Sequence, residues 1–270
     1  MRRFRQVDVF GVQPLLGNPV AVVLDGDGLT YAQMLGIARW TNLSETTFVL
    51  PPTDPAADYR VRIFTPGQEL PFAGHPTLGT CHAWLEISDH RGHEVVQECG
   101  AGLVTIRRGE RLAFAAPPVI RSGPVALPDL TRIAKVLNIA VEEIQDAAWV
   151  DNGPGWVAVR LASVERVLQV RPGELDGSFI GVVAPGPEAL EVRAFFPANG
   201  VCAEDPVTGS LNASLAPWLT ESGIVSYPYE ARQGQVVGRD GRVHLSTDEH
   251  GTVWVAGATH TVITGELDVP

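Results

Sequence analysis

Three titratable side chains stand in sequence settings that could support proton transfer. Glu45 directly precedes the apolar and β-branched run Thr46-Thr47-Phe48-Val49-Leu50, which is typical of a buried strand. Desolvation there would raise the pKa of a carboxyl group, and such a poised acid is what general acid–base catalysis uses. A structural alternative stays open, because Asn42 and Glu45 have the spacing of a helix capping box.

His75 and Asp205 are the other two side chains, and each is followed by a proline. We expect a helix to start at each place, with His75 or Asp205 at or near the N-cap and Pro76 or Pro206 at the first helical position. Free amides at a helix start form an anion site. Each segment could also cap a structural helix without any chemical role.

The elements that position these residues occur twice along the chain. Val61–Pro66 reads VRIFTP, and Val192–Pro197 reads VRAFFP. Further along, His75–Thr80 reads HPTLGT, and its counterpart Asp205–Ser210 reads DPVTGS. Because the matched segments recur in the same order, we predict an internal duplication.

Two further pairs of segments bear on this duplication. A weaker match joins Val20–Leu24 to Val157–Leu161, and the stretch near Ser178–Val182 has no carboxylate where the first half has Glu45. Thr105–Leu112 and Val236–Val243 are predicted to form β-hairpins, because both carry turn residues in the middle. Those turn residues are Gly109 in one and Asp240-Gly241 in the other.

The fold class that follows is α+β, in two pseudo-symmetric lobes. We place the first lobe at residues 1–116 and the second at 117–257, with 258–270 possibly returning to the first. The Pro-rich stretch at Ala115–Pro118 is the predicted crossing point, and Leu130–Val136 has the spacing of a short surface helix. With pseudo-twofold symmetry, the two helix starts would face one cleft and hold a carboxylate between them.

Composition limits the partners. The chain has 270 residues and a formal net charge of −11, which disfavours nucleic acid and anionic membranes. Apolar runs are too short to span a bilayer, and no signal peptide is recognisable, so we expect a cytoplasmic protein. No dinucleotide or P-loop fingerprint occurs in the sequence.

The cysteines and histidines give little support to metal or thiol chemistry. The three cysteines, Cys81, Cys99 and Cys202, show no C-x-x-C spacing. His90 and His93 stand in a polar segment that reads as a solvated turn. Cys81 and His82 are neighbours on one predicted helix and diverge by about 100°, so they cannot act as a thiol–base pair. We expect neither a metal nor an organic cofactor.

Several of these motifs together resemble the PhzF family of phenazine-biosynthesis-like isomerases. The resemblance rests on the following segments: Gln6–Phe10, Gly17–Val22, Asn42–Thr46, Phe72–Thr77, Glu204–Ser210, Gln233-Gly234 and Gly238–Gly241. It implies a diaminopimelate-epimerase-like fold, in which each lobe is a β-barrel-like sheet wrapped around a central helix. It also implies a homodimer.

The resemblance assigns roles to particular residues. Glu45 matches the family's catalytic glutamate, and His75, Asp205 and Ser210 would contact the substrate. Catalytic roles are predicted for Glu45, His75 and Asp205. The predicted substrate-binding residues are Gly74, Pro76, Thr77, Gly209 and Ser210.

The predicted function is that of a cofactor-independent isomerase, of the trans-2,3-dihydro-3-hydroxyanthranilate isomerase type, which moves a proton on a small carboxylated cyclic or unsaturated substrate. Two alternatives remain. An amino-acid racemase or epimerase of the same fold would use two thiols, but those positions fall near Gly74 and Asp205, and neither is cysteine. A carboxylate-binding protein without catalysis is the second alternative, although a pure anion binder gains nothing from a buried carboxylate.

Overall fold

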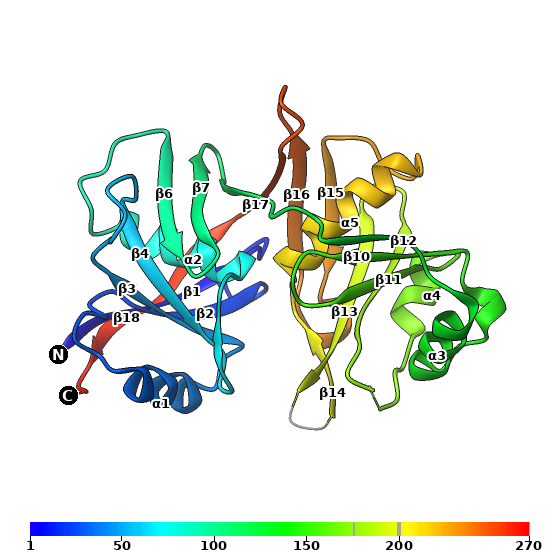
Figure 1. Ribbon diagram of the computed structural model, residues 1–270, viewed down its shortest axis with the longest axis horizontal. Helices are drawn as coiled ribbons and strands as arrows, with labels where there is room; N and C mark the ends of the chain where they lie inside the picture. Colours follow the sequence, from blue (N-terminus) through cyan, green and yellow to red (C-terminus); the bar gives the residue numbers. More distant parts are fainter. Residues whose placement is uncertain (175, 199–200, 270) are drawn as a thin grey trace. The chain divides into compact units, whose positions relative to one another are not determined.

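The computed structural model describes residues 1–174, 176–198 and 201–269, and the chain divides into two compact units. The first unit comprises Met1–Ala115 and Ala256–Pro270, and the second comprises Ala116–Val255. The sequence places the lobes at 1–116 and 117–257 and leaves open the return of 258–270 to the first. Strands outnumber helices in both units (Figure 1). Among the helices of the described residues, none is long and apolar enough to cross a membrane.

The first unit is a sheet wrapped around one helix, α2. Its elements are β1 (Arg2–Val9), β2 (Asn18–Val23), α1 (Tyr31–Thr41), β3 (Glu45–Leu50), β4 (Tyr59–Phe64), β5 (Glu69–Leu70), α2 (Gly74–Leu85), β6 (Glu94–Cys99), β7 (Gly102–Arg108), β8 (Leu112–Ala115) and β18 (Thr259–Leu267). Helix α2 contacts β1, β2, β3, β6, β8 and β18, so strands surround it (Figure 1). Helix α1 covers the outer side of the sheet, where Met34 packs with Phe48 and Phe64.

The second unit repeats this plan around helix α5. Its elements are β9 (Arg121–Pro124), α3 (Leu127–Leu137), a 3₁₀ turn (Val141–Glu143), β10 (Asp146–Asp151), β11 (Trp156–Arg160), α4 (Val164–Gln169), β12 (Phe179–Pro185), β13 (Leu190–Ala198), β14 (Val201–Asp205), α5 (Gly209–Glu221), β15 (Tyr229–Gln233), a second 3₁₀ turn (Gln235–Val237), β16 (Gly241–Thr247) and the first part of β17 (Val253–Gly257), whose last residues belong to the first unit. Helix α5 contacts β10 and β16. Helices α3 and α4 cover the outer side, where Leu137 and Val167 pack with Val182.

The strand pairings show the predicted duplication. In the first unit β2 pairs in parallel with β3, β3 antiparallel with β4, and β4 in parallel with β6. In the second unit β11, β12, β13 and β15 pair in the same order and with the same directions. Helix α2 follows β5 and helix α5 follows β14. Each unit is thus an α+β sheet around a central helix, as predicted.

Helix α3 and the C-terminal strand β18 can both be compared with the sequence. The predicted surface helix at Leu130–Val136 is confirmed as α3, whose buried side chains Ile133, Ala134, Val136 and Leu137 form one face. At the C-terminus, β18 pairs antiparallel with β1, so this part of the chain returns to the first unit.

One predicted hairpin is confirmed and the other is wrong. Strands β7 and β8 pair antiparallel around Gly109, as expected for Thr105–Leu112. The segment Val236–Val243 contains the end of a 3₁₀ turn and the first residues of β16, which pairs with β15. Gly234 and Gly238 flank that turn with φ of 99° and 74°, a conformation that suits glycine and redirects the chain.

Candidate active site

Glu45 and His75 lie next to each other in the first unit. Glu45 is the first residue of β3, as the sequence predicted, and His75 is the second residue of α2. Glu45 Oε2 lies 3.3 Å from His75 Nε2, and the side chains are 15% and 6% exposed. Of the residues predicted to be catalytic, these two are therefore in direct contact.

The sheet explains why these two side chains meet. The parallel pairing of β2 with β3 sets Glu45 opposite Val20, directly after Pro19. The imidazole of His75 forms a hydrogen bond with the backbone of Pro19. A proline backbone offers only a carbonyl acceptor, so the ring N–H of His75 must donate to it. Since Nε2 faces Glu45, we assign that hydrogen to Nδ1, which leaves Nε2 as an acceptor.

The charge state of His75 follows from its burial. Desolvation lowers the pKa of His75 from 6.5 to about 3, although the hydrogen bond to Pro19 acts in the opposite direction. The imidazole is therefore neutral at ordinary pH. A neutral Nε2 and a carboxylate oxygen are both acceptors, so their contact is attractive only when a proton lies between them. The pair can therefore share a hydrogen bond once Glu45 has taken up a proton, with the carboxylic acid donating to His75 Nε2.

The start of α2 supplies backbone donors beside this pair. The N-cap is Ala73, and no side chain caps the helix. The prediction that His75 is at the N-cap with Pro76 first in the helix is therefore displaced, because Gly74 is first and Pro76 is third. Proline fits anywhere in the first turn, where amides lack a partner within the helix. The amides of Gly74 and His75 are the first two of this turn.

Thr77 differs from the other predicted binding residues of this helix in having an evident structural contact. Its side chain is fully buried, and its hydroxyl accepts a hydrogen bond from Gln97 Nε2 at 3.0 Å. Gln97 in turn accepts from the hydroxyl of Tyr59 at 3.0 Å. Thr77 thus joins α2 to β6 and β4 inside the first unit.

In the second unit, Asp205 does not lie at the N-cap of the helix as predicted. It is the last residue of β14, and the N-cap of α5 is Thr208, so Pro206 precedes the helix instead of beginning it. The Thr208 hydroxyl donates to Asp205 Oδ2 at 2.6 Å. Asp205 is thereby connected to the helix start through Thr208. Gly209 and Ser210 are the first two helical residues.

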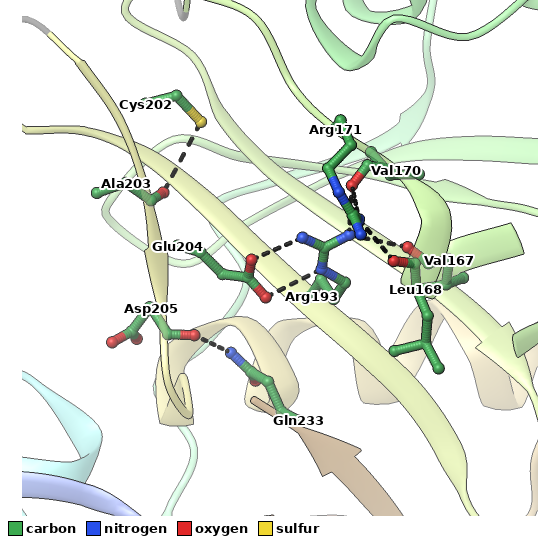
Figure 2. A network of polar contacts seen from close by, with 10 residues as sticks. All are labelled: Val167, Leu168, Val170, Arg171, Arg193, Cys202, Ala203, Glu204, Asp205 and Gln233. Carbon is green, nitrogen blue, oxygen red and sulfur yellow. Dashed lines mark hydrogen bonds and ion pairs between the residues drawn. The ribbon is translucent and has the colours of Figure 1, made fainter. Parts of the chain in front are cut away.

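Gln233 organises the turn between Asp205 and α5. Its Nε2 donates to the Asp205 carbonyl at 3.0 Å, shown in Figure 2, and to the Thr208 hydroxyl at 2.9 Å. Its Oε1 accepts from the Thr208 amide and from Asn212 Nδ2, both at 3.1 Å. Gln233 is fully buried, so these four hydrogen bonds satisfy its whole amide group.

A buried ion pair fixes the strand that ends at Asp205. Arg193 on β13 donates two hydrogen bonds to Glu204 on β14, at 2.9 and 2.6 Å (Figure 2). Arg193 also donates to the carbonyls of Val167 and Val170 at the end of α4. The paired arrangement holds β14 against the sheet and α4.

Sequence reasoning did not identify Pro19, Thr208, Gln233 or Arg193 as contributors. Pro19 and Gln233 lie in segments that carried the family resemblance, but neither is a residue type that suggests catalysis. Their roles depend on pairings between distant strands. Thr208 could have been recognised as an N-cap from its residue type and the following Gly209.

The described residues include no group of three or more His, Cys, Asp or Glu side chains able to hold a metal ion. His90, from the loop considered above, instead lies 3.4 Å from Asp58 and packs against Trp84. Cys81 is fully buried, and burial raises its pKa to about 12. Burial also raises the pKa of the Cys202 thiol. Neither thiol is prepared to act as a base at neutral pH.

The two sheet-around-helix units define a fold shared with racemases. A probable proline racemase from Agrobacterium radiobacter K84 matches with a TM-score of 0.62 over 100% of this chain and 94% of its own, at 13% identity. A PhzF-family phenazine biosynthesis protein from Enterococcus faecalis matches with a TM-score of 0.84 over the whole of both chains, at 26% identity. This is the diaminopimelate-epimerase-like fold.

Within this class the chain belongs to the PhzC-PhzF family of phenazine biosynthesis-like proteins, whose model matches residues 7–265. A relative from Pseudomonas fluorescens, named trans-2,3-dihydro-3-hydroxyanthranilate isomerase, is 36% identical and covers 88% of each chain. Another from Schizosaccharomyces pombe, named antisense-enhancing sequence 1, is 33% identical and covers 97% of each.

Proposed function

We propose that this protein is a PhzF-type isomerase that moves a proton on a small carboxylated substrate, cyclic or unsaturated, without a metal or organic cofactor. The observation that carries the proposal is the 3.3 Å contact between Glu45 and a buried, neutral His75. The name of the Pseudomonas fluorescens relative supports the reaction type. Relatives of comparable identity carry other names, so the proposal extends to a substrate class only.

In this mechanism Glu45 acts first as a base and then as an acid. Its carboxylate removes a proton from a carbon next to an unsaturated group, and the electron pair of the broken C–H bond delocalises into that group. The carboxylic acid formed on Glu45 then donates a hydrogen bond to His75 Nε2. This hydrogen bond holds the Glu45 side chain, and the proton on it, in place. Return of the proton to a different carbon completes the isomerisation and regenerates the carboxylate.

The helix starts provide the anion-binding part of the proposal. The amides of Gly74 and His75 at α2, and those of Gly209 and Ser210 at α5, are the groups we propose for binding negatively charged oxygens of the substrate. Asp205 is proposed as a further residue that contacts the substrate. Pro76 has no backbone N–H, so in the first turn of α2 it adds no donor that would compete with the amides of Gly74 and His75.

The racemase alternative gains no support from the thiols, because Cys81 is buried with a raised pKa and the expected thiol positions hold Gly74 and Asp205. The carboxylate-binding alternative is distinguished by experiment. The predicted homodimer, the lack of nucleic-acid and membrane partners, and the cytoplasmic location stay predictions.

The test is solvent deuterium incorporation. The protein is incubated in heavy water with trans-2,3-dihydro-3-hydroxyanthranilate, and deuterium entering carbon is followed by NMR. The Glu45→Gln variant should lose the exchange by about 100-fold or more, as expected for removal of a general acid–base group. The matched control is Glu249→Gln, because the Glu249 side chain is 86% exposed; this variant should exchange at the normal rate.

Three results would count against the proposal. Exchange that persists in Glu45→Gln would remove the assignment of Glu45. Loss of exchange after alkylation of thiols would favour a cysteine mechanism. Tight binding of the carboxylate without any exchange in the unmodified protein would favour a binding protein.

A further inference from the structure

Two side chains of the second unit converge on Ser210 at the start of α5. Trp156 Nε1 donates a hydrogen bond to Ser210 Oγ at 3.2 Å. Asn152 Nδ2 donates to the Ser210 carbonyl at 2.9 Å. Trp156 is the first residue of β11, and Asn152 lies in the short loop between β10 and β11. The β10–β11 loop and the start of β11 thus contact the backbone and the side chain of Ser210, respectively.

The contact with Trp156 restricts what the Ser210 hydroxyl can do. An indole N–H is only a donor, so it occupies a lone pair of Oγ and leaves the hydroxyl hydrogen to be donated elsewhere. Within the described part of the chain, the structure gives that hydrogen no acceptor. Ser214 and Thr220 on the same helix differ, since their hydroxyls donate to the carbonyls of Leu211 and Ala216.

The donors themselves are held firmly. Trp156 is 3% exposed, and its ring packs edge-to-face on Phe179 at 5.4 Å between centroids. In the loop, Asp151 Oδ1 accepts hydrogen bonds from the amides of Gly153 and Gly155, at 2.7 and 2.6 Å. Both glycines have positive φ, 141° and 96°, which lets the loop close tightly around the carboxylate.

We propose that Trp156 and Asn152 are positioning residues that orient Ser210 as a hydrogen-bond donor toward a negatively charged oxygen of the substrate. The inference rests on the proposed function, in which Ser210 contacts a carboxylated substrate. It adds a selection rule, because a hydroxyl whose hydrogen must be donated outward binds a carboxylate or carbonyl oxygen and disfavours an ammonium group at the same point.

A double-mutant cycle tests this role. The variants Trp156→Phe, Ser210→Ala and the combination are compared by the KM and kcat of deuterium exchange with trans-2,3-dihydro-3-hydroxyanthranilate. Each single change should raise KM about tenfold, the effect of one lost hydrogen bond of ordinary strength. The combination should be no worse than Ser210→Ala alone, because Trp156 acts only through the Ser210 hydroxyl.

The matched control is Trp254→Phe, since the Trp254 indole lies in the same unit but donates to Asp248, at 2.9 Å, instead of to Ser210. It should leave KM unchanged. Phenylalanine keeps the apolar ring at both positions, and urea unfolding of each variant checks that the fold persists.

A second readout separates this inference from the proposed function. The dissociation constant of 3-hydroxyanthranilate, measured by calorimetry, needs no turnover and should follow the same cycle. If the effects of Trp156→Phe and Ser210→Ala on the dissociation constant are coupled, but the protein catalyses no deuterium exchange, the positioning role is upheld and the isomerase proposal is rejected. Two results would overturn the positioning role. One is an effect of Trp156→Phe that persists in the Ser210→Ala background. The other is that the unmodified protein does not bind 3-hydroxyanthranilate.

Discussion

At the scale of single residues, the burial of the His75 imidazole has a measurable consequence. Because the pKa of His75 is about 3, this imidazole stays neutral across the range in which a free histidine titrates. We therefore predict that kcat/KM for the isomerisation shows no change of slope near pH 6.5 caused by His75. The pH profiles of the unmodified protein and of His75→Asn provide the comparison.

Asparagine is the informative replacement, because its amide can donate to the Pro19 carbonyl, as the imidazole does, and can accept from a protonated Glu45. Partial activity is expected for His75→Asn and a larger loss for His75→Phe, which offers neither group. An inflection near pH 6.5 that disappears in His75→Asn would contradict the assignment of a neutral imidazole.

Glu191 on β13 carries a second prediction, for stability. It is 2% exposed, and burial raises its pKa from 4.5 to about 7, although Gln235 and three arginines, Arg193, Arg232 and Arg242, lower it in part. Between pH 4.5 and 7 the folded state binds this proton and the unfolded chain does not. The free energy of unfolding should therefore decrease as pH rises through this window, by up to about 3 kcal/mol from this group.

Urea denaturation of the unmodified protein and of Glu191→Gln at about pH 5 and about pH 8 measures this contribution. Glutamine keeps an acceptor for Gln235, whose Nε2 donates to Glu191 Oε2 at 2.6 Å, and it does not ionise. The variant should lose less stability between the two pH values than the unmodified protein. Equal losses would show that Glu191 is already ionised in the folded state at the lower pH.

At the scale of elements, α2 packs so closely on the sheet that Gly79 has no room for a side chain. A Cβ at this position would overlap Val20 Cγ1 and lie 3.1 Å from Val9 Cγ2, and both valines are fully buried. Gly79→Ala should lower the free energy of unfolding by about 1–2 kcal/mol, because overpacking outweighs the gain in helix propensity.

Gly36 in α1 is the matched control. Nothing lies within 4 Å of a Cβ built there, so Gly36→Ala should raise the free energy of unfolding by about 0.5–1 kcal/mol. Urea unfolding of both variants gives the comparison. Stabilisation by Gly79→Ala would mean that α2 can shift away from β1 and β2.

The elements also show how far sequence patterns reach. The β-branched run after Glu45 predicted β3 correctly, since local residue types and burial agree there. Helix starts were displaced because proline fits several positions of a first turn. The partner of His75 could not be predicted, because the Pro19 carbonyl reaches it only through the pairing of β2 with β3.

At the scale of the whole molecule, the two units share one plan but differ in the side chain at the position of Glu45. The parallel pairing that sets Val20 opposite Glu45 in the first unit sets Val157 opposite Ile180 in the second. Ile180 is fully buried in an apolar cluster, so the second unit has no acid at this place. Both units have a helix start, whereas at this position the first unit has the Glu45 carboxylate and the second has the aliphatic side chain of Ile180.

Asp205 tests whether a carboxylate of the second unit takes part in the reaction. We predict that Asp205→Asn lowers kcat/KM by about 100-fold, while the unfolding free energy changes by no more than about 1 kcal/mol, because an amide can still accept from the Thr208 hydroxyl. Asp89→Asn, at a fully exposed side chain, is the control. If Asp205→Asn retains normal deuterium exchange, its carboxylate has no part in the reaction, and catalysis then depends on Glu45 and His75 without it.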